Sequence, residues 1–146
     1  MPEVHDALTA DLDPATLYAL LRLRSEVFVV EQACAYLDPD GRDLEATCRQ
    51  LWVVGEDGAV VATARLLTDG DGTRRIGRVC TDPAQRGTGV AGALLDRAIA
   101  LAGGAPMILD AQSHLAPWYA RYGFVATGRT FVEDDIDHTE MTRAAG

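Results

Sequence analysis

The chain has 146 residues with a net charge of −9 at pH 7, and 48% of its residues are hydrophobic. This length predicts one domain, spanning residues 1–146, that can bury a core without disulfides or a structural metal. The acidic balance argues against nucleic acid or an anionic membrane as a partner, because both bind basic surfaces, and it favours a cationic substrate.

The N-terminal residues and the cysteines give no sign of export. The chain begins Met1-Pro2-Glu3-Val4-His5-Asp6, which lacks the charged and apolar regions of a signal peptide. No stretch approaches the roughly 18 apolar residues that a membrane-spanning helix requires. Cys34, Cys48 and Cys80 are an odd number at unrelated spacings, which predicts neither a disulfide framework nor a cysteine metal site. We therefore expect a cytoplasmic protein.

The N-terminal part predicts an edge strand near residues 3–9, followed by a helix. Asp13-Pro14 begins the helix, because the aspartate offers an N-cap oxygen and proline suits the first turn. Apolar residues at helical spacing predict its buried face, which comprises Leu17, Leu20, Leu21, Val27 and Phe28. The charged residues of this segment should lie mainly outside that face, namely Arg22, Arg24, Glu26 and Glu31.

A loop and three antiparallel strands follow the helix. Residues 34–47 are loop-like, with a strong turn signal at Asp38-Pro39-Asp40-Gly41. Short turns rich in glycine and aspartate then separate three apolar runs, which predict strands at 50–54, 59–67 and 76–81.

A glycine-rich loop connects the third of these strands to the next helix and predicts a phosphate site. Gly87, Gly89 and Gly92 lack the Cβ atoms that would hold an anion away from the backbone, and the first N–H groups of a helix have no partner within it. The helix is predicted over 90–102 from apolar residues three and four apart. A P-loop is excluded because the chain contains no lysine.

A dinucleotide site is another interpretation of this loop. Gly87-x-Gly89-x-x-Gly92 matches the Rossmann fingerprint literally, and Asp110 lies at the end of the next predicted strand. However, residues 82–86 separate the first glycine from its strand, whereas the Rossmann glycine lies in the tight turn at the strand end. Antiparallel strands also come first, so the context disfavours this interpretation.

The remainder predicts a parallel strand, a short helix and a closing hairpin. The parallel strand covers 106–112 and is reached from strand 76–81 by a right-handed crossover through the helix. The short helix is predicted at 115–122, and the hairpin strands near 124–131 and 138–143 are separated by the acidic run 133–137. These elements indicate an α+β fold with one mixed, mostly antiparallel sheet flanked by helices.

Two motifs resemble the GCN5-related N-acetyltransferase (GNAT) family. Arg86-x-x-Gly89-x-Ala91 is similar to the family's R/Q-x-x-G-x-G/A loop, which holds the pyrophosphate of coenzyme A. Trp118-Tyr119-Ala120-Arg121-Tyr122-Gly123-Phe124 resembles the family's F-Y-x-x-x-G-F segment at the expected distance downstream. Segments 26–32, 36–41, 111–119 and 133–138 resemble the ElaA-type branch. The resemblance covers nearly the whole chain and implies the element order β-α-α-β-β-β-α-β-α-β-β.

The resemblance implies acetyl-CoA as the cosubstrate, bound where the two parallel strands splay apart. Backbone groups of Val79, Cys80 and Thr81 would pair with the pantetheine arm, and an N–H of this segment would stabilise the oxyanion. The pyrophosphate would lie on the loop residues Arg86, Gly87, Thr88, Gly89, Val90, Ala91 and Gly92. Gln112 stands where many relatives have an asparagine that contacts the cofactor.

The resemblance also implies direct transfer to a primary amine, with Tyr119 as the general acid that protonates the departing thiolate. Glu31 is the first candidate for the base, because it follows the helix that borders the acceptor cleft in relatives; Glu26, His114 and His138 come after it. Each has a purely structural alternative, since half-buried aromatics, solvated carboxylates and lone histidines are common.

The expected partner is a small-molecule or peptide amine, and an acidic lip at 133–137 would attract a cationic one. This run lacks the spacing and the central glycine of a calcium loop, so no metal is expected. A non-catalytic module of the same fold that binds acyl-CoA is the main alternative function. The oligomeric state, a homodimer included, stays open.

Overall fold

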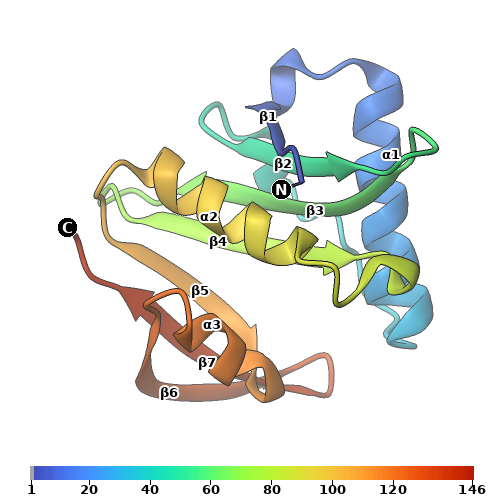
Figure 1. The fold of residues 1–146 in the computed structure, drawn as a ribbon. Coiled ribbons are helices and arrows are strands. Elements are labelled where there is room, and N and C mark those ends of the chain that lie inside the picture. The colour runs from blue at the N-terminus through green and yellow to red at the C-terminus, as the bar shows by residue number, and fades with distance from the viewer. Residues whose placement is uncertain (1) are drawn as a thin grey trace.

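The computed structural model describes residues 2–146, and all seven strands found there form one sheet (Figure 1). The strand order is β1-β2-β3-β4-β5-β7-β6, and every neighbouring pair is antiparallel except β4 and β5. The strands are β1 (His5–Leu8), β2 (Arg49–Val54), β3 (Val60–Thr68), β4 (Arg74–Thr81), β5 (Met107–Gln112), β6 (Val125–Glu133) and β7 (Ile136–Arg143). This architecture confirms the predicted α+β fold.

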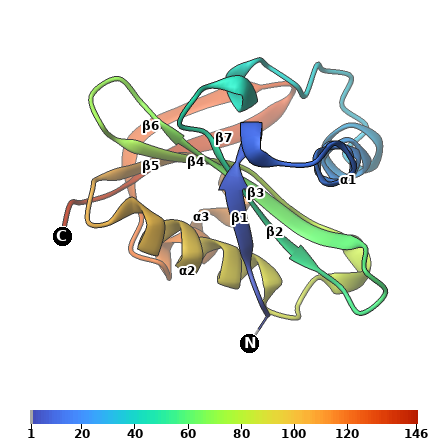
Figure 2. The ribbon, with the colours of Figure 1, turned by 90° about the horizontal axis from the view of Figure 1, so that it is seen from above.

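Helices cover both faces of the sheet. They are α1 (Pro14–Arg24), α2 (Val90–Ala102) and α3 (Ala116–Ala120). α2 and α3 lie on one face, and α1 lies on the other, where it packs against β3 and β4 (Figures 1 and 2). No helix within residues 2–146 is long and apolar enough to cross a membrane.

The first helix begins as the sequence predicts but continues differently. Asp13 Oδ1 accepts a hydrogen bond from the Thr16 N–H at 2.7 Å, which confirms the predicted N-cap. After α1 the helix widens into a π-helical segment, η2 (Ser25–Glu31), and the described chain before β2 then holds only one 3₁₀ turn, η3 (Arg42–Leu44). The second α-helix of the expected order is therefore replaced by η2. Arg24, expected outside the buried face, is instead only 1% exposed.

The main core lies between α2 and the sheet. Leu94 and Leu95 of α2 are fully buried, and they share a cluster with Leu51, Leu66 and Leu109 of the strands. Burying a leucine side chain stabilises the fold by about 1.5–3 kcal/mol. This packing fixes the first turn of α2 beside the end of β4.

The turn between β6 and β7 is tighter than predicted. Asp134 and Asp135 have φ angles of 52° and 62°, and the strands extend to Glu133 and start again at Ile136. Two consecutive left-handed residues match the natural twist of a two-residue hairpin. The expected loop over 133–137 is therefore a two-residue turn.

β4 and β5 are paired only at their N-terminal ends, where Arg74 lies beside Met107 and Arg75 beside Ile108. Beyond Arg75 the two strands diverge (Figure 1). Backbone N–H and C=O groups along the facing edges then have no strand partner and are free to bind a ligand. The sheet is thus opened at the position where the chain carries its predicted site residues.

Candidate active site

A cleft of about 1140 Å³ opens where β4 and β5 diverge. β4 and the loop after it form one wall, while β5, α3 and the β6–β7 hairpin form the opposite one. The end of η2 and residues 34–40 complete the lining. Pockets for single small molecules measure about 300–1,000 Å³, so this cleft is large enough for an extended cofactor together with a second substrate.

The glycine-rich loop has the shape that an anion site requires. Gly87 and Gly89 have φ angles of +80° and +88°, which favour glycine, and no atom lies within 4 Å of where their Cβ atoms would stand. Gly89 is the N-cap of α2, so the unpaired N–H groups of the first helical turn follow directly. Arg86, Gly87 and Ala91 line the cleft. Their role in holding pyrophosphate stays a prediction.

Two other residues of the predicted cofactor loop have structural partners. Thr88 Oγ1 donates a hydrogen bond to the Gln85 carbonyl at 2.6 Å, which closes the loop on itself. The Val90 side chain is 7% exposed and belongs to the main core. Any contact of these two residues with a cofactor would therefore use the backbone.

Gly92 lacks a side chain for a reason that the sequence did not reveal. It lies inside α2, and a Cβ built there would overlap the hydroxyl of Tyr122 and stand 3.5 Å from the ring carbon that carries it. The space beside Gly92 is thus occupied by a residue of the aromatic segment after α3. Close packing of Tyr122, rather than access for an anion, explains this third glycine.

We expect Gly92→Ala to lower the free energy of unfolding by about 1–3 kcal/mol, the usual cost of overpacking, although alanine is the better helix former. In a Tyr122→Phe background the overlap disappears, and the same substitution should stabilise the protein by up to about 1 kcal/mol. Urea denaturation of the four proteins in this cycle measures both effects. A stabilising Gly92→Ala in the presence of Tyr122 would show that the contact is absent.

Glu31 and Arg86 form a bidentate ion pair across the mouth of the cleft. Both Arg86 Nη atoms donate to the Glu31 carboxylate at 2.6 Å; the Arg86 side chain is 45% exposed and that of Glu31 38%. The hydrogen bonds from Arg86 lower the pKa of Glu31. A carboxylate with a lowered pKa is a weaker proton acceptor, so this contact weighs against Glu31 as the base.

Tyr119 lies in the core wall of the cleft. Its ring packs edge-on against Trp118 and Phe124, with centroids 4.9 and 6.4 Å apart, and the residue is 8% exposed. Burial raises the pKa of Tyr119 to about 12. The phenol therefore keeps its proton at physiological pH and is available as a donor toward the cleft.

Val79, Cys80 and Thr81 line the cleft along β4, and the strand has a bulge at Arg78 and Val79. The register of β3 against β4 shifts between Thr63 and Arg65, so that Arg78 and Val79 together lie opposite one residue of β3. Arg78 has a φ of +51°. Nothing in the sequence signals this bulge, because arginine is not a residue type that favours the left-handed region.

The remaining predicted cofactor contact and two histidines also line the cleft. Gln112 at the end of β5 donates to Gln32 Oε1 at 3.3 Å, and both residues line the cleft. His114 and His138 line it as well. Glu26 does not, because it pairs with Arg22 at 2.9 Å on the exposed side of the helix. No group of three or more metal-ligating side chains is gathered anywhere in residues 2–146.

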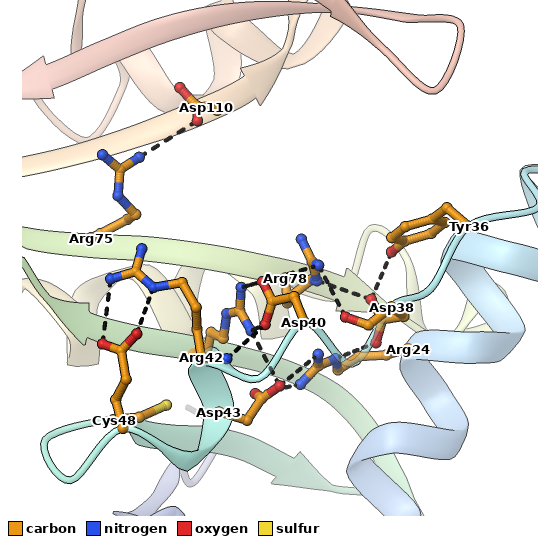
Figure 3. Close-up of polar contacts among 12 residues, drawn as sticks. Arg24, Tyr36, Asp38, Asp40, Arg42, Asp43, Cys48, Arg75, Arg78 and Asp110 are labelled. Atoms are coloured by element: carbon orange, nitrogen blue, oxygen red, sulfur yellow. Dashed lines mark hydrogen bonds and ion pairs between the residues drawn. The ribbon is translucent and has the colours of Figure 1, made fainter.

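Sequence reasoning missed a network of paired charges beneath the cleft, which Figure 3 shows. Arg24 is its centre, with Nε 2.8 Å from Asp38 Oδ2 and Nη1 2.8 Å from Asp43 Oδ1. Three arginines and three aspartates balance one another in what we call the arginine–aspartate network, comprising Arg24, Arg65, Arg78, Asp38, Asp40 and Asp43.

The arginine–aspartate network fixes the 34–47 loop to the body of the protein. Burial acts to raise the pKa of Asp43, but the hydrogen bonds and charges of Arg24 and Arg65 outweigh it and hold this pKa below its ordinary value. Hydrogen bonds from Arg65 hold the pKa of Asp40 well below its usual range. Asp40 and Asp43 therefore stay ionised and bind the loop to α1, β3 and β4.

Comparison with known proteins gives matches over nearly the whole chain. A family model described as an acetyltransferase (GNAT) domain matches residues 25–145. A UPF0039 protein of Mycobacterium tuberculosis is 48% identical over 136 residues, covering 91% of this chain and 87% of the relative.

Two solved structures are similar in both sequence and fold. The crystal structure of Escherichia coli ElaA is 37% identical, with a TM-score of 0.89 over 98% of this chain and 99% of that one. An acyl-CoA N-acyltransferase from Pseudomonas aeruginosa is 43% identical, with a TM-score of 0.91 over 99% of this chain and all of that one (100%).

Proposed function

Because this chain belongs to the GNAT acetyltransferase family, we propose that it transfers an acetyl group from acetyl-CoA to a primary amine. The observation that carries the proposal is the divergence of β4 from β5 beside a left-handed glycine loop. This arrangement offers unpaired backbone groups to a pantetheine arm and N–H groups to a pyrophosphate within one cleft.

Acetyl-CoA would lie along β4. The pyrophosphate would be held by the N–H groups that follow Gly87 and by the charge of Arg86, whose Nε takes no part in the bidentate pair with Glu31. The pantetheine arm would pair with the backbone of residues 79–81, and Gln112 would contact it from β5. The thioester then stands near the bulge of β4, where a backbone N–H would stabilise the oxyanion formed on attack.

The reaction requires two proton movements. An alkyl amine has a pKa of about 10.4 and must lose a proton before its nitrogen can attack the thioester carbonyl. As the C–N bond forms and the C–S bond breaks, Tyr119 would give its proton to the departing sulfur and later regain one from solvent. Its raised pKa, about 12, keeps the phenol protonated before each cycle.

His138 is the base that the geometry favours over Glu31. Its Nδ1 lies 2.8 Å from the Ile136 carbonyl, which can only accept, so in the neutral ring Nδ1 carries the hydrogen and Nε2 has the free lone pair. Stacking on Phe131, at 5.3 Å between centroids, holds the ring in the cleft wall. We expect His138→Asn to lower kcat/KM by about 10²-fold near neutral pH.

This loss should shrink at alkaline pH, because the acceptor amine then arrives deprotonated and needs no base. Initial rates measured from neutral to alkaline pH for the wild type, His138→Asn and Glu31→Gln separate the two candidates. A pH-dependent loss in Glu31→Gln and none in His138→Asn would return the role to Glu31.

The acceptor proposed for the cleft is cationic. Five carboxylates line the cleft, namely Glu31, Asp40, Asp110, Glu133 and Asp134. Glu31 is paired with Arg86 and Asp40 with Arg65, and Asp110 lies 3.5 Å from Arg75. Glu133 and Asp134 at the β6–β7 turn form no ion pair within the described chain. A positively charged amine would be drawn to this side of the cleft.

Two measurements test the proposed function. Calorimetry should detect binding of acetyl-CoA and none of NADH; tight NADH binding without acetyl-CoA binding would reject the family's chemistry for this cleft.

Acetyl-CoA consumption should then be screened against polyamines, amino sugars, basic peptides and uncharged amines at low and high salt. Cationic acceptors should lose kcat/KM as salt rises, while uncharged amines should not. Equal salt responses would show that the acidic residues of the β6–β7 turn take no part in acceptor recognition.

A further inference from the structure

Arg78 is held in an unfavourable backbone conformation inside a strand. Its φ of +51° lies in the left-handed region, which costs energy for every residue with a Cβ. The other such non-glycine residues within 2–146 all lie outside the strands: Ala33, Asp134 and Asp135. Strain of this kind persists only where surrounding contacts enforce it.

The bulge at Arg78 decides which face of the sheet each later side chain of β4 takes. Ile76 is buried in the cluster that contains α2, whereas Cys80, four residues on, is buried with Leu23 and Val27 of the opposite face. In a regular strand, residues four apart share a face. The bulge therefore shifts the alternation and sets the orientation of the backbone that lines the cleft beyond Gly77.

Residues of the 34–41 loop contact the side chain of Arg78 and hold it in place (Figure 3). Its Nε lies 2.9 Å from Asp38 Oδ1, and its Nη2 donates to the Asp38 carbonyl at 3.0 Å. Nη2 also lies 3.5 Å from Asp40 Oδ2, and the guanidinium stands over the Tyr36 ring at 5.7 Å from its centroid. The carbonyl oxygen and a carboxylate oxygen of Asp38 thus both hold the Arg78 guanidinium in place.

Asp38 is itself immobilised. It is 2% exposed, and its carboxylate accepts from Arg24 Nε at 2.8 Å and from the Tyr36 hydroxyl at 2.6 Å. Arg24 is anchored in turn by Asp43. Because these partners fix the Asp38 carboxylate, it cannot move with Arg78. The position of the loop therefore determines the position of the Arg78 side chain on β4.

We propose that Asp38 is a positioning residue, which acts through Arg78 to hold the β4 bulge and so aims the backbone N–H that meets the thioester carbonyl. The inference rests on the proposed function for the identity of that ligand. It gives the turn Asp38-Pro39-Asp40-Gly41 an indirect role in acetyl transfer, although Asp38 itself is buried beneath the cleft wall.

Two truncations at position 78 test this. Arg78→Gly and Arg78→Ala remove the same charge and the same contacts, but only glycine adopts the left-handed conformation without cost. If the contacts of the Arg78 side chain with Asp38 hold the bulge, kcat should be about 5- to 30-fold lower in Arg78→Ala than in Arg78→Gly. Asp38→Asn should also lower kcat, and adding Arg78→Gly should restore it to the level of Arg78→Gly alone.

A second readout needs no acceptor amine. The bulge N–H would meet the acetyl carbonyl, which free CoA lacks, so the ratio of Kd for CoA to Kd for acetyl-CoA should fall in Arg78→Ala and stay near the wild-type ratio in Arg78→Gly. Equal kcat and equal ratios in the two truncated proteins, at matched Tm, would overturn the proposal. A wild type that binds acetyl-CoA but acetylates no amine would instead reject the proposed function, and the ratio would still test the bulge.

Discussion

Replacing Tyr119 by phenylalanine is expected to lower kcat by about 10²–10⁴-fold while acetyl-CoA affinity changes little. The substitution removes one hydroxyl and leaves the ring that packs against Trp118 and Phe124. A loss of this size corresponds to about 3–5 kcal/mol of transition-state stabilisation. The measurement is steady-state turnover with a verified amine, alongside calorimetry with acetyl-CoA.

Tyr18→Phe is the matched control, because Tyr18 lies on α1 with 71% of its surface exposed and takes no part in the cleft. It should keep wild-type turnover. Near-full activity in Tyr119→Phe would reject Tyr119 as the acid, provided that chemistry limits the rate. The wild-type rate should also show no alkaline loss from this residue until pH approaches its pKa of about 12.

The second large effect concerns the arginine–aspartate network. Arg24→Met should lower the free energy of unfolding by about 3–5 kcal/mol, because it leaves the carboxylates of Asp38 and Asp43 buried without their main partner. That is a large part of the 5–15 kcal/mol by which domains are ordinarily stable. Urea denaturation at neutral pH measures the loss.

The matched control is Arg22→Met, two residues earlier in the same helix. Arg22 pairs with Glu26, but the side chains are 70% and 52% exposed, so its loss should cost less than about 1 kcal/mol. Equal losses in the two variants would contradict the importance of the buried network.

The difference in the free energy of unfolding between the wild type and Arg24→Met should become smaller in acid. In the wild type the pKa of Asp43 is lowered, so its contribution is present above the unfolded pKa of about 3.9 and is lost as pH falls through the folded value. Without Arg24, burial of the Asp43 carboxyl is less opposed, so the pKa of Asp43 should rise above its wild-type value. Protonation then relieves the variant before it harms the wild type, and the two free energies of unfolding should approach each other as pH falls toward and below about 4.

Most of the fold could be predicted from local patterns. Apolar alternation and glycine-rich turns predicted the strands, and the 90–102 helix was confirmed because its periodic face is the one that packs on the sheet. The glycine loop was predictable because only glycine adopts the conformations of Gly87 and Gly89 without strain.

The parts that were missed depend on partners distant in the chain. A charged residue in a helix is normally placed toward solvent, and Arg24 is buried only because Asp38 and Asp43 fold over it, 14 and 19 residues later. Glu31 and Arg86 lie 55 residues apart, so their ion pair could not be predicted by spacing. The Arg78 bulge has no local signal at all, since the contact that we propose to hold it comes from Asp38, 40 residues earlier.

The central claim, acetyl transfer to an amine in the β4–β5 cleft, is tested most directly by counting both products in one sample. The wild-type protein, acetyl-CoA and an acceptor from the amine screen should yield free thiol and acetylated amine in equal amounts, and Tyr119→Phe should yield little of either. Normal acetyl-CoA binding with neither product for any amine would contradict the account and identify a module that only binds acyl-CoA.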